Sequence, residues 1–347
     1  MIDFRYHLVS IVAVFLALAI GIVLGSTELQ GPAFSLLDKT TSKLQSELGQ
    51  VSSQRDTAQQ QATEGEMYAQ AVEPAVLHNL LTGHRLLIVT EPGAQSSVVS
   101  GITAAAIHAG ATVTGQINLQ PKFFDTSGTA QDSLNQTTLA VSQPTGLQLD
   151  ASATYQQQAA QLIASEILTS APGSAAGGVG GNQGTSTDAS TMLQAYAASQ
   201  FLSTSGQPAT PASLAVVVTP QTAPSDGSAD QLAQVLPPLV QELAAKSGAA
   251  VVVGSSGGSG AGSPIAVLRS NNVSSQVSTV DNADLAAGQT VAMQALAVEL
   301  TGGKAGSYGF TANGATAIAP SPAPTASASA SATPSSSTST KKKKASG

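Results

Sequence analysis

The sequence contains no cysteine, which excludes disulfide bonds, thiolate metal sites, iron–sulfur clusters and cysteine nucleophiles. It also lacks tryptophan, and only 10% of its 347 residues are charged, against about 25% in an average globular protein. The formal net charge is −7, and the one dense basic run, Lys341 to Lys344, lies at the end of the chain. A nucleic-acid-binding face has no electrostatic support in this composition, so we expect no nucleic-acid partner.

An uncharged apolar run near the N-terminus is long enough to cross a membrane. Residues 8–25 read LVSIVAVFLALAIGIVLG. Arg5 precedes this run and the next basic residue is Lys39, so the positive-inside rule puts residues 1–7 in the cytoplasm and the bulk of the chain outside. A cleaved signal peptide is the alternative, because small residues lie near Gly25. The run exceeds the usual length of the apolar region within a signal peptide, and we therefore expect a single-pass anchor in the cell membrane.

Small residues recur every four positions along this run, at Ala13, Ala17, Gly21 and Gly25. A GxxxG pattern lets two helix backbones approach closely. Ala17, Gly21 and Gly25 are therefore candidate self-association residues. The alternative is that alanine and glycine are simply common in membrane helices.

Residues 28–70 have the pattern of a coiled coil. Between Phe34 and Tyr68 apolar residues follow a 3,4 spacing, with Thr41 and Arg55 in two of the core positions. This pattern predicts a homo-oligomer. The alternative is a long amphipathic helix that packs on its own domain. The predicted self-association residues of this segment are Leu37, Leu44, Leu48 and Val51.

Residues 74–318 alternate strand and helix signals, which predicts an extracytoplasmic α/β domain with a mostly parallel, Rossmann-like sheet flanked by helices. The predicted strands are residues 86–90, 112–119, 214–219, 249–253 and 277–280. The predicted helices are residues 97–109, 151–169, 192–202, 230–246, 264–269 and 288–300.

Two segments have compositions that are typical of disorder. Gly- and Ser-rich residues 172–191 predict a mobile loop, and residues 319–347 predict a disordered Pro/Ala/Ser/Thr tail that ends in the lysine run. These lysines could contact anionic lipid or wall polymer. The alternative is a solubilising end without a specific partner.

Side chains that could hold a soft metal are few and scattered. No two of them lie three or four residues apart, as a helical metal motif would require. The sequence therefore contains no metal motif, and it leaves open a site that the fold could assemble. The side chains concerned are His7, His78, His84, His108, Met1, Met67, Met192 and Met293.

Two stretches could in principle bind a cofactor or catalyse a reaction. Gly254 to Pro264 follows an apolar strand and precedes a helix, and Asp281 ends the next strand, as in a dinucleotide site. The loop lacks both GxGxxG and the P-loop lysine, so we expect a plain loop and no cofactor. Asp281 and Asp284 could form an acid/base or metal pair. The alternative is a local role, in which Asp284 caps the following helix or takes part in a turn. No GxSxG nucleophile elbow is present, and we expect no enzyme.

A family resemblance is visible in two stretches, RYHLVSIVAVFLALAIGIVLGS at residues 5–26 and VSTVDNADLAAGQTVAMQALAVELTGG at residues 277–303, the latter followed by GSYG at 306–309. Together they resemble the actinobacterial MctB family of copper transport outer membrane proteins. The resemblance implies copper transport or homeostasis at the envelope of a mycolate-type actinobacterium or a relative, with an outer-membrane location and copper ion as a partner. It assigns no copper ligand to a numbered position.

The residues themselves limit the mechanism. A pore needs several helices or a closed barrel, and one predicted membrane helix supplies neither. We therefore expect a non-enzymatic oligomeric component of copper transport. The alternative is a coiled-coil scaffold that binds and regulates another envelope protein, such as a cell-wall hydrolase, with no metal chemistry of its own.

Overall fold

The computed structural model describes residues 4–169, 186–222, 229–258, 260–309 and 319–320, and within residues 26–34 and 186–187 it describes the backbone only. The chain divides into two compact units, Met1–Tyr68 and Ala69–Gly347. One helix, α1 (Phe4–Leu77), begins in the first unit and ends in the second.

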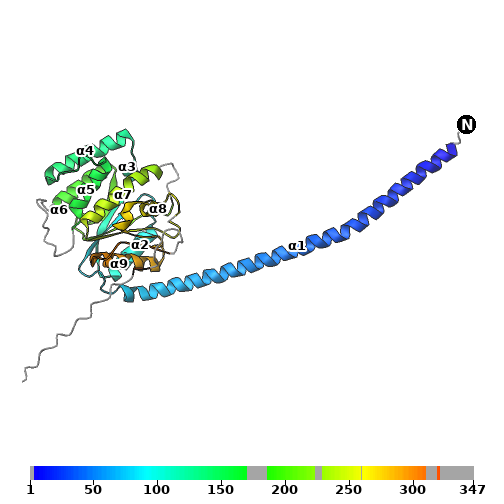
Figure 1. Cartoon of the computed structure of the whole chain (residues 1–347), viewed down its shortest axis with the longest axis horizontal. Coiled ribbons are helices and arrows are strands. Elements are labelled where there is room, and N and C mark those ends of the chain that lie inside the picture. The colour runs from blue at the N-terminus through cyan, green and yellow to red at the C-terminus, as the bar shows by residue number, and fades with distance from the viewer. Residues whose placement is uncertain (1–3, 170–185, 223–228, 259, 310–318, 321–347) are drawn as a thin grey trace, which may run out of the picture. The chain divides into compact units, whose positions relative to one another are not determined.

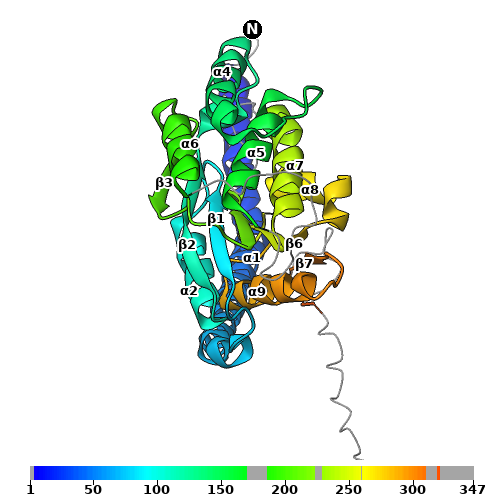
Figure 2. The same ribbon diagram turned by 90° about the vertical axis from the view of Figure 1, so that its left-hand side faces the viewer.

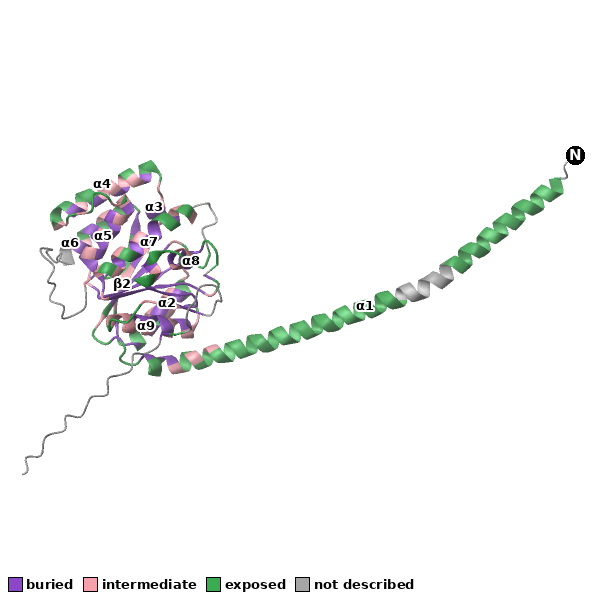
Figure 3. Cartoon of the chain, in the orientation of Figure 1, coloured by how far each residue is buried: buried purple, intermediate pink, exposed green. Residues whose placement is uncertain are grey.

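The first unit is helical throughout its described length. Its first 22 residues, Phe4–Gly25, form a helix long and apolar enough for a single-pass membrane anchor. The helix then continues through polar sequence, and the side chains from Ser35 to Gly65 are exposed (Figure 3). Local pairs such as Lys43 with Glu47, 3.8 Å apart, support this part of the helix, but exposed pairs of this kind contribute only about 0.3 to 0.5 kcal/mol each.

The described residues of the second unit build a seven-stranded sheet of order β3-β2-β1-β4-β5-β6-β7. Neighbouring strands are parallel except for β2 and β3, which pair antiparallel. This confirms the predicted mostly parallel sheet. The strands are β1 (Arg85–Thr90), β2 (Thr112–Leu119), β3 (Leu202–Gly206), β4 (Leu214–Val218), β5 (Ala249–Val253), β6 (Ser278–Val280) and β7 (Ser307–Tyr308).

Helices cover both faces of this sheet (Figures 1 and 2). Side chains alternate along the strands, so that Leu86 and Ile88 face one core cluster while Leu87 and Val89 face the other. The last turns of α1, α2 (Ser96–His108) and α9 (Ala286–Leu300) cover the first face. The second face is covered by α3 (Pro121–Phe124), α4 (Gly128–Thr145), α5 (Tyr155–Ile167), α6 (Ser186–Ala198), α7 (Ala229–Lys246), α8 (Pro264–Arg269) and the 3-10 helix η1 (Asn272–Ser275).

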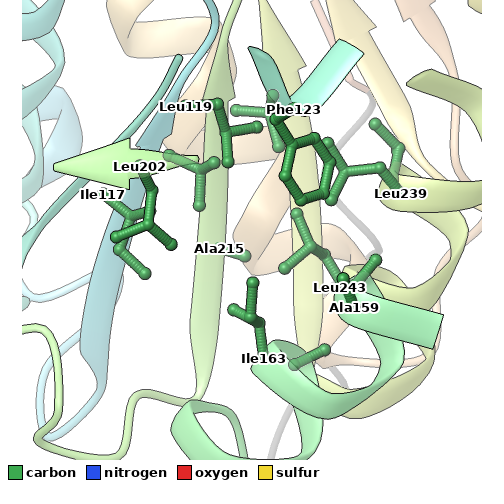
Figure 4. Packing of buried hydrophobic residues seen from close by; sticks show 14 of the residues in the cluster. Ile117, Leu119, Phe123, Ala159, Ile163, Leu202, Ala215, Leu239 and Leu243 are labelled. Carbon is green, nitrogen blue, oxygen red and sulfur yellow. The ribbon is translucent and has the colours of Figure 1, made fainter. Parts of the chain in front are cut away.

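The second face holds the larger aromatic and branched side chains. Phe123 of α3 points toward Leu239 of α7, while Ile163 of α5 lies against Ala215 of β4 (Figure 4). Because strands β4 and β5 are buried along their whole length, they require apolar partners on both faces. The two helical layers therefore hold the central strands of the sheet in place between them.

The structure changes two predicted boundaries around α6. Residues 186–191, predicted as part of the mobile loop 172–191, form the start of this helix, and residues 172–185 lie outside the described residues. Asp188 in the first turn interacts favourably with the positive end of the helix dipole. The predicted end at Leu202 is also wrong, because Gln200 adopts a left-handed conformation with φ 62° and Leu202 begins β3.

Helix α4 was not predicted, because its buried stripe is not apolar enough to be recognised. The stripe repeats every four residues and consists of Ala130, Leu134, Thr138 and Ser142. Thr138 is satisfied inside the protein by the Leu134 carbonyl and the Tyr196 hydroxyl, at 2.8 Å and 2.9 Å. Of the predicted tail 319–347, only residues 319–320 lie within the described part of the chain.

Candidate functional site at the carboxyl edge of the sheet

The strand order creates a switch point between β1 and β4. The chain leaves β1 through α2 toward β2 on one side, whereas β4 leads through α7 to β5 on the other side. Helices α2 and α7 also lie on opposite faces of the sheet. In open α/β sheets, ligands bind outside the carboxyl ends of the strands at such a point. The candidate site is therefore the carboxyl edge, defined here as residues 91–95, 219–222, 254–258 and 281–285.

Glu91 directly follows β1 and is buried, with 3% of its surface exposed. Its backbone N–H donates to the Val218 carbonyl at 2.9 Å, but neither side-chain oxygen has a hydrogen-bond partner in the described structure. Burial raises the pKa of Glu91 to about 8, so the side chain carries a proton at neutral pH. An unpaired buried carboxyl is rare at a purely structural position.

Two further buried polar atoms at the carboxyl edge lack a partner among the described residues. They are Ser255 Oγ after β5 and Asn282 Oδ1 after β6, in residues that are 1% and 3% exposed. The backbone around them is well ordered, because Ala283 N–H donates to the Gly254 carbonyl at 2.8 Å. Unpaired polar groups therefore follow three strands of one sheet edge.

Exposed and half-buried side chains tie the loops of this edge together. Gln95 Nε2 donates to Gln221 Oε1 at 3.4 Å, and Gln221 Nε2 donates to the Ser256 carbonyl at 2.6 Å. Asp284 Oδ1 accepts from the Ser256 N–H at 2.6 Å and from the Ser256 hydroxyl at 2.8 Å. We call these four residues the strap. It connects the loops that follow β1, β4, β5 and β6.

Asp281, considered above as a ribose-binding or catalytic acid, forms a buried ion pair. Its Oδ2 accepts from Arg269 Nη1 at 2.7 Å. Arg269 also donates to Thr279 Oγ1 at 2.9 Å and to the Tyr308 carbonyl at 2.8 Å. The pair thus joins α8 to β6 and β7. A Cβ atom at Gly309 would overlap the Asp281 carboxylate, so the glycine is required there.

Of the two local roles expected for Asp284, the helix cap is wrong and the position in a turn is confirmed. The N-cap of α9 is Leu285, without a side-chain cap, and Asp284 binds Ser256 instead. Asp281 and Asp284 thus have separate partners. In the loop from Gly254 to Pro264, the hydroxyl of Ser263 accepts from Ala266 N–H at 3.3 Å and caps α8.

Imidazole and thioether groups are dispersed through the structure. His78 contacts Asn79 at 2.9 Å, His84 contacts Ser213 at 3.2 Å and His108 contacts Glu73 at 2.9 Å. Among the residues with described positions, no group of three or more His, Cys, Asp or Glu could hold a metal ion. Met192 and Met293 lie in opposite core clusters, Met67 is exposed in the first unit, His7 is exposed on α1, and Met1 lies outside the described residues.

The predicted self-association residues lie on α1. No atom outside the helix lies within 4 Å of the Cβ position at Gly21 or Gly25, and Ala17 is exposed. Arg55, in a predicted core position, pairs with its neighbour Asp56 at 2.8 Å. Self-association through these residues stays a prediction. The four large apolar side chains are exposed by 68% (Leu37), 53% (Leu44), 69% (Leu48) and 62% (Val51).

Sequence reasoning missed Glu91. A signal was present, because this acid comes immediately after the apolar run LLIVT and before Pro92 and Gly93. In a parallel sheet, that position lies at the carboxyl edge. Asn282, by contrast, lies within the stretch that resembles the MctB family, but nothing in that stretch indicates that its side chain is buried and unpaired.

Comparison with known proteins gives a consistent result. The family model described as "Copper transport outer membrane protein, MctB" matches residues 1–320. A protein named copper transporter MctB from Mycobacterium tuberculosis (strain ATCC 25618 / H37Rv) is 26% identical over 320 residues, which cover 92% of this chain and 99% of the relative. A protein of the same name from Mycobacterium leprae (strain TN) is 28% identical over 324 residues, with the same coverage.

Proposed function

The chain belongs to the MctB family of copper transport outer membrane proteins, and on that premise we propose that it is a membrane-anchored, non-enzymatic and oligomeric component of copper transport at the cell envelope. The match over residues 1–320 is the observation that supports this proposal most directly. The apolar helix Phe4–Gly25 supports single-pass anchoring. The basic residue Arg5 before it supports a cytoplasmic N-terminus, with the bulk of the chain outside.

The distribution of possible ligands supports an indirect role for this chain in moving copper. Cu(I) prefers thiolate and thioether sulfur, and Cu(II) prefers imidazole. Cysteine is absent, Met192 and Met293 are buried in opposite core clusters, and the described histidines of the second unit each have a polar neighbour. Copper, the cargo, would then be bound between subunits or by another envelope component.

A protein with a single membrane span could contribute to a transport path only as an oligomer. One helix cannot enclose a polar path through lipid, because the path needs a complete protein wall. Leu37, Leu44, Leu48 and Val51 are each more than half exposed, and burying a side chain of this size stabilises an assembly by about 1.5 to 3 kcal/mol. The close spacing of Gly21 and Gly25 supports helix contact within the membrane.

A second candidate function uses the same surface. The exposed apolar residues of α1 could bind a different envelope protein, such as a cell-wall hydrolase, and the chain would then act as a coiled-coil scaffold. The exposure of Leu44 and Leu48 favours this candidate as much as it favours self-association. Deletion of the gene distinguishes the two functions. It should change copper content if the chain acts in copper transport, and cell shape if the chain acts as a scaffold.

A deletion strain complemented with variants tests the proposal. We expect the deletion to change copper content and growth under copper stress, and wild-type protein to restore both. The double variant Leu44→Glu/Leu48→Glu should fail to complement, because buried unpaired carboxylates separate the helices. Its matched control, Ser46→Glu/Ser53→Glu, adds the same charge on the outer face of the predicted heptad and should complement.

Two results would contradict the proposal. One is a deletion strain with normal copper content and altered cell shape or wall lysis, which would support the scaffold instead. The other is full complementation by Leu44→Glu/Leu48→Glu, which would remove oligomerisation from the mechanism.

A further inference from the structure

We propose that the carboxyl edge of the sheet binds a small organic cation whose primary ammonium group pairs with Glu91. The proposal goes beyond copper transport and does not depend on it. Its starting point is the position of the unpaired buried groups, because Glu91, Ser255 and Asn282 follow β1, β5 and β6 at one edge of one sheet. Buried polar groups without partners call for a ligand, water or ion that completes them.

The charges at this edge favour a cation over an anion. The carboxyl edge contains three acids, Glu91, Asp281 and Asp284, and no Lys, Arg or His, since its residues read EPGAQ at 91–95, TPQT at 219–222, GSSGG at 254–258 and DNADL at 281–285. Arg269 reaches the edge, and its side chain donates hydrogen bonds to Asp281, Thr279 and Tyr308. Arg269 balances the charge of Asp281, and the edge has no basic residue for Asp284 or an ionised Glu91. A phosphate or carboxylate ligand would therefore meet uncompensated negative charge.

The spacing of the unpaired groups favours an organic ligand over a metal ion. Strand β4 lies between β1 and β5, and β6 follows β5. At about 4.8 Å per strand, the backbones at Glu91 and Ser255 are roughly 10 Å apart, and those at Glu91 and Asn282 roughly 14 Å apart. One ion cannot contact the side chains of both Glu91 and Asn282 across the longer of these spans. A small molecule with donors at both ends can, and the described residues provide no three-ligand metal group.

The strap explains how such a ligand would reach buried groups. Gln95, Gln221, Ser256 and Asp284 join the loops through bonds that lie at the exposed surface. Water can replace these bonds when they break, so they cost little to open. The longest of them, from Gln95 to Gln221 at 3.4 Å, spans the switch point between β1 and β4. Opening the strap separates the loop that begins at Glu91 from the loop that follows β4.

Binding is coupled to release of one proton. The O–H bond of the neutral Glu91 carboxyl breaks, the proton passes to a buffer base, and the carboxylate pairs with the ammonium group of the ligand. Burial is the cause of the raised pKa of Glu91, and no charged side chain of the described residues contributes to it. The ammonium group therefore supplies the positive partner that Glu91 lacks in the free protein.

Calorimetry on the detergent-solubilised full chain tests this proposal with 1,4-diaminobutane as the probe. We expect the diamine to bind, and 1,4-butanediol and inorganic phosphate not to bind. Measurements at neutral pH in two buffers of different ionisation enthalpy should show release of nearly one proton. Glu91→Gln keeps the shape but cannot ionise, and it should weaken binding about 30-fold or more and abolish proton release. Asp132→Asn, which removes an exposed acid of α4, should change neither.

Several outcomes would overturn the proposal. They are absence of diamine binding, equal binding of the diol, binding without proton release, and normal binding by Glu91→Gln. If Glu91→Gln fails to fold, as hydrogen exchange in β1 and β4 would reveal, a second variant decides. Gln95→Ala/Gln221→Ala opens the strap without altering the unpaired groups and should tighten diamine binding several-fold, because the open form becomes more populated. Unchanged affinity in that variant would count against the proposal.

Discussion

Replacing Glu91 with glutamine should remove a large pH dependence from the stability of the sheet. Burial raises the pKa of this carboxyl from 4.5 to about 8. Between these values the unfolded chain has lost a proton that the folded chain retains, so the free energy of unfolding falls as the pH rises. The contribution of the protonated Glu91 side chain to the free energy of unfolding is fully present below pH 4.5 and is lost as the pH rises through about 8.

The size of the effect follows from the same two pKa values. At about 1.4 kcal/mol per pH unit, the interval from 4.5 to about 8 corresponds to about 5 kcal/mol. About 3 kcal/mol of this is already lost at neutral pH. Glutamine has nearly the same shape and does not ionise. Glu91→Gln should therefore match the wild type in acid, exceed its stability by about 3 kcal/mol at neutral pH, and exceed it by about 5 kcal/mol above pH 8.

Urea unfolding of the detergent-solubilised chain, measured at a series of pH values, gives the required comparison. The chain has no tryptophan, so hydrogen exchange of amides in β1 and β4 is the better probe, and it reports on the sheet that surrounds Glu91. Other acids also titrate, and burial raises the pKa of Glu299. The decisive quantity is therefore the difference between the two curves. Parallel curves for wild type and Glu91→Gln would refute the reasoning, because they would mean that Glu91 ionises without cost.

Three further predictions concern other parts of the chain. Arg269→Met should destabilise the second unit by about 3 to 5 kcal/mol, because the buried Asp281 carboxylate then loses the guanidinium that balances its charge; urea unfolding measures this, and a neutral result would contradict a structural role for the pair. Sedimentation of the solubilised chain should show an oligomer that Leu44→Glu/Leu48→Glu dissociates and Arg55→Leu tightens, and a monomeric wild type would refute the coiled coil. Calorimetry with Cu(I) and Cu(II) should detect only weak, nonspecific binding, and a stoichiometric sub-micromolar site would instead indicate direct transport by this chain.

The sequence was sufficient for the segments whose structure depends on nearby residues. The apolar runs of β1, β4 and β5 predicted buried parallel strands, because a strand covered on both faces must be apolar along its length. The apolar run near the N-terminus predicted a helix of membrane length in the same way. Prediction failed for β3, where four of five residues are exposed and pairing depends on β2, a strand more than 80 residues earlier in the chain.

The candidate site also combines features that the sequence predicts with features that depend on the folded chain. Sequence patterns drew attention to Asp281 and Asp284 because both follow a strand, yet their roles depend on Arg269 and Ser256, which approach only in the folded chain. Glu91 shows the limit most clearly. Its position after an apolar strand could be read from the sequence, but its proton and its missing partners could not. The protonated state and the missing partners of Glu91 arise because helices and loops from distant parts of the chain exclude water around its carboxyl group. That exclusion exists only once the sheet has been covered on both faces.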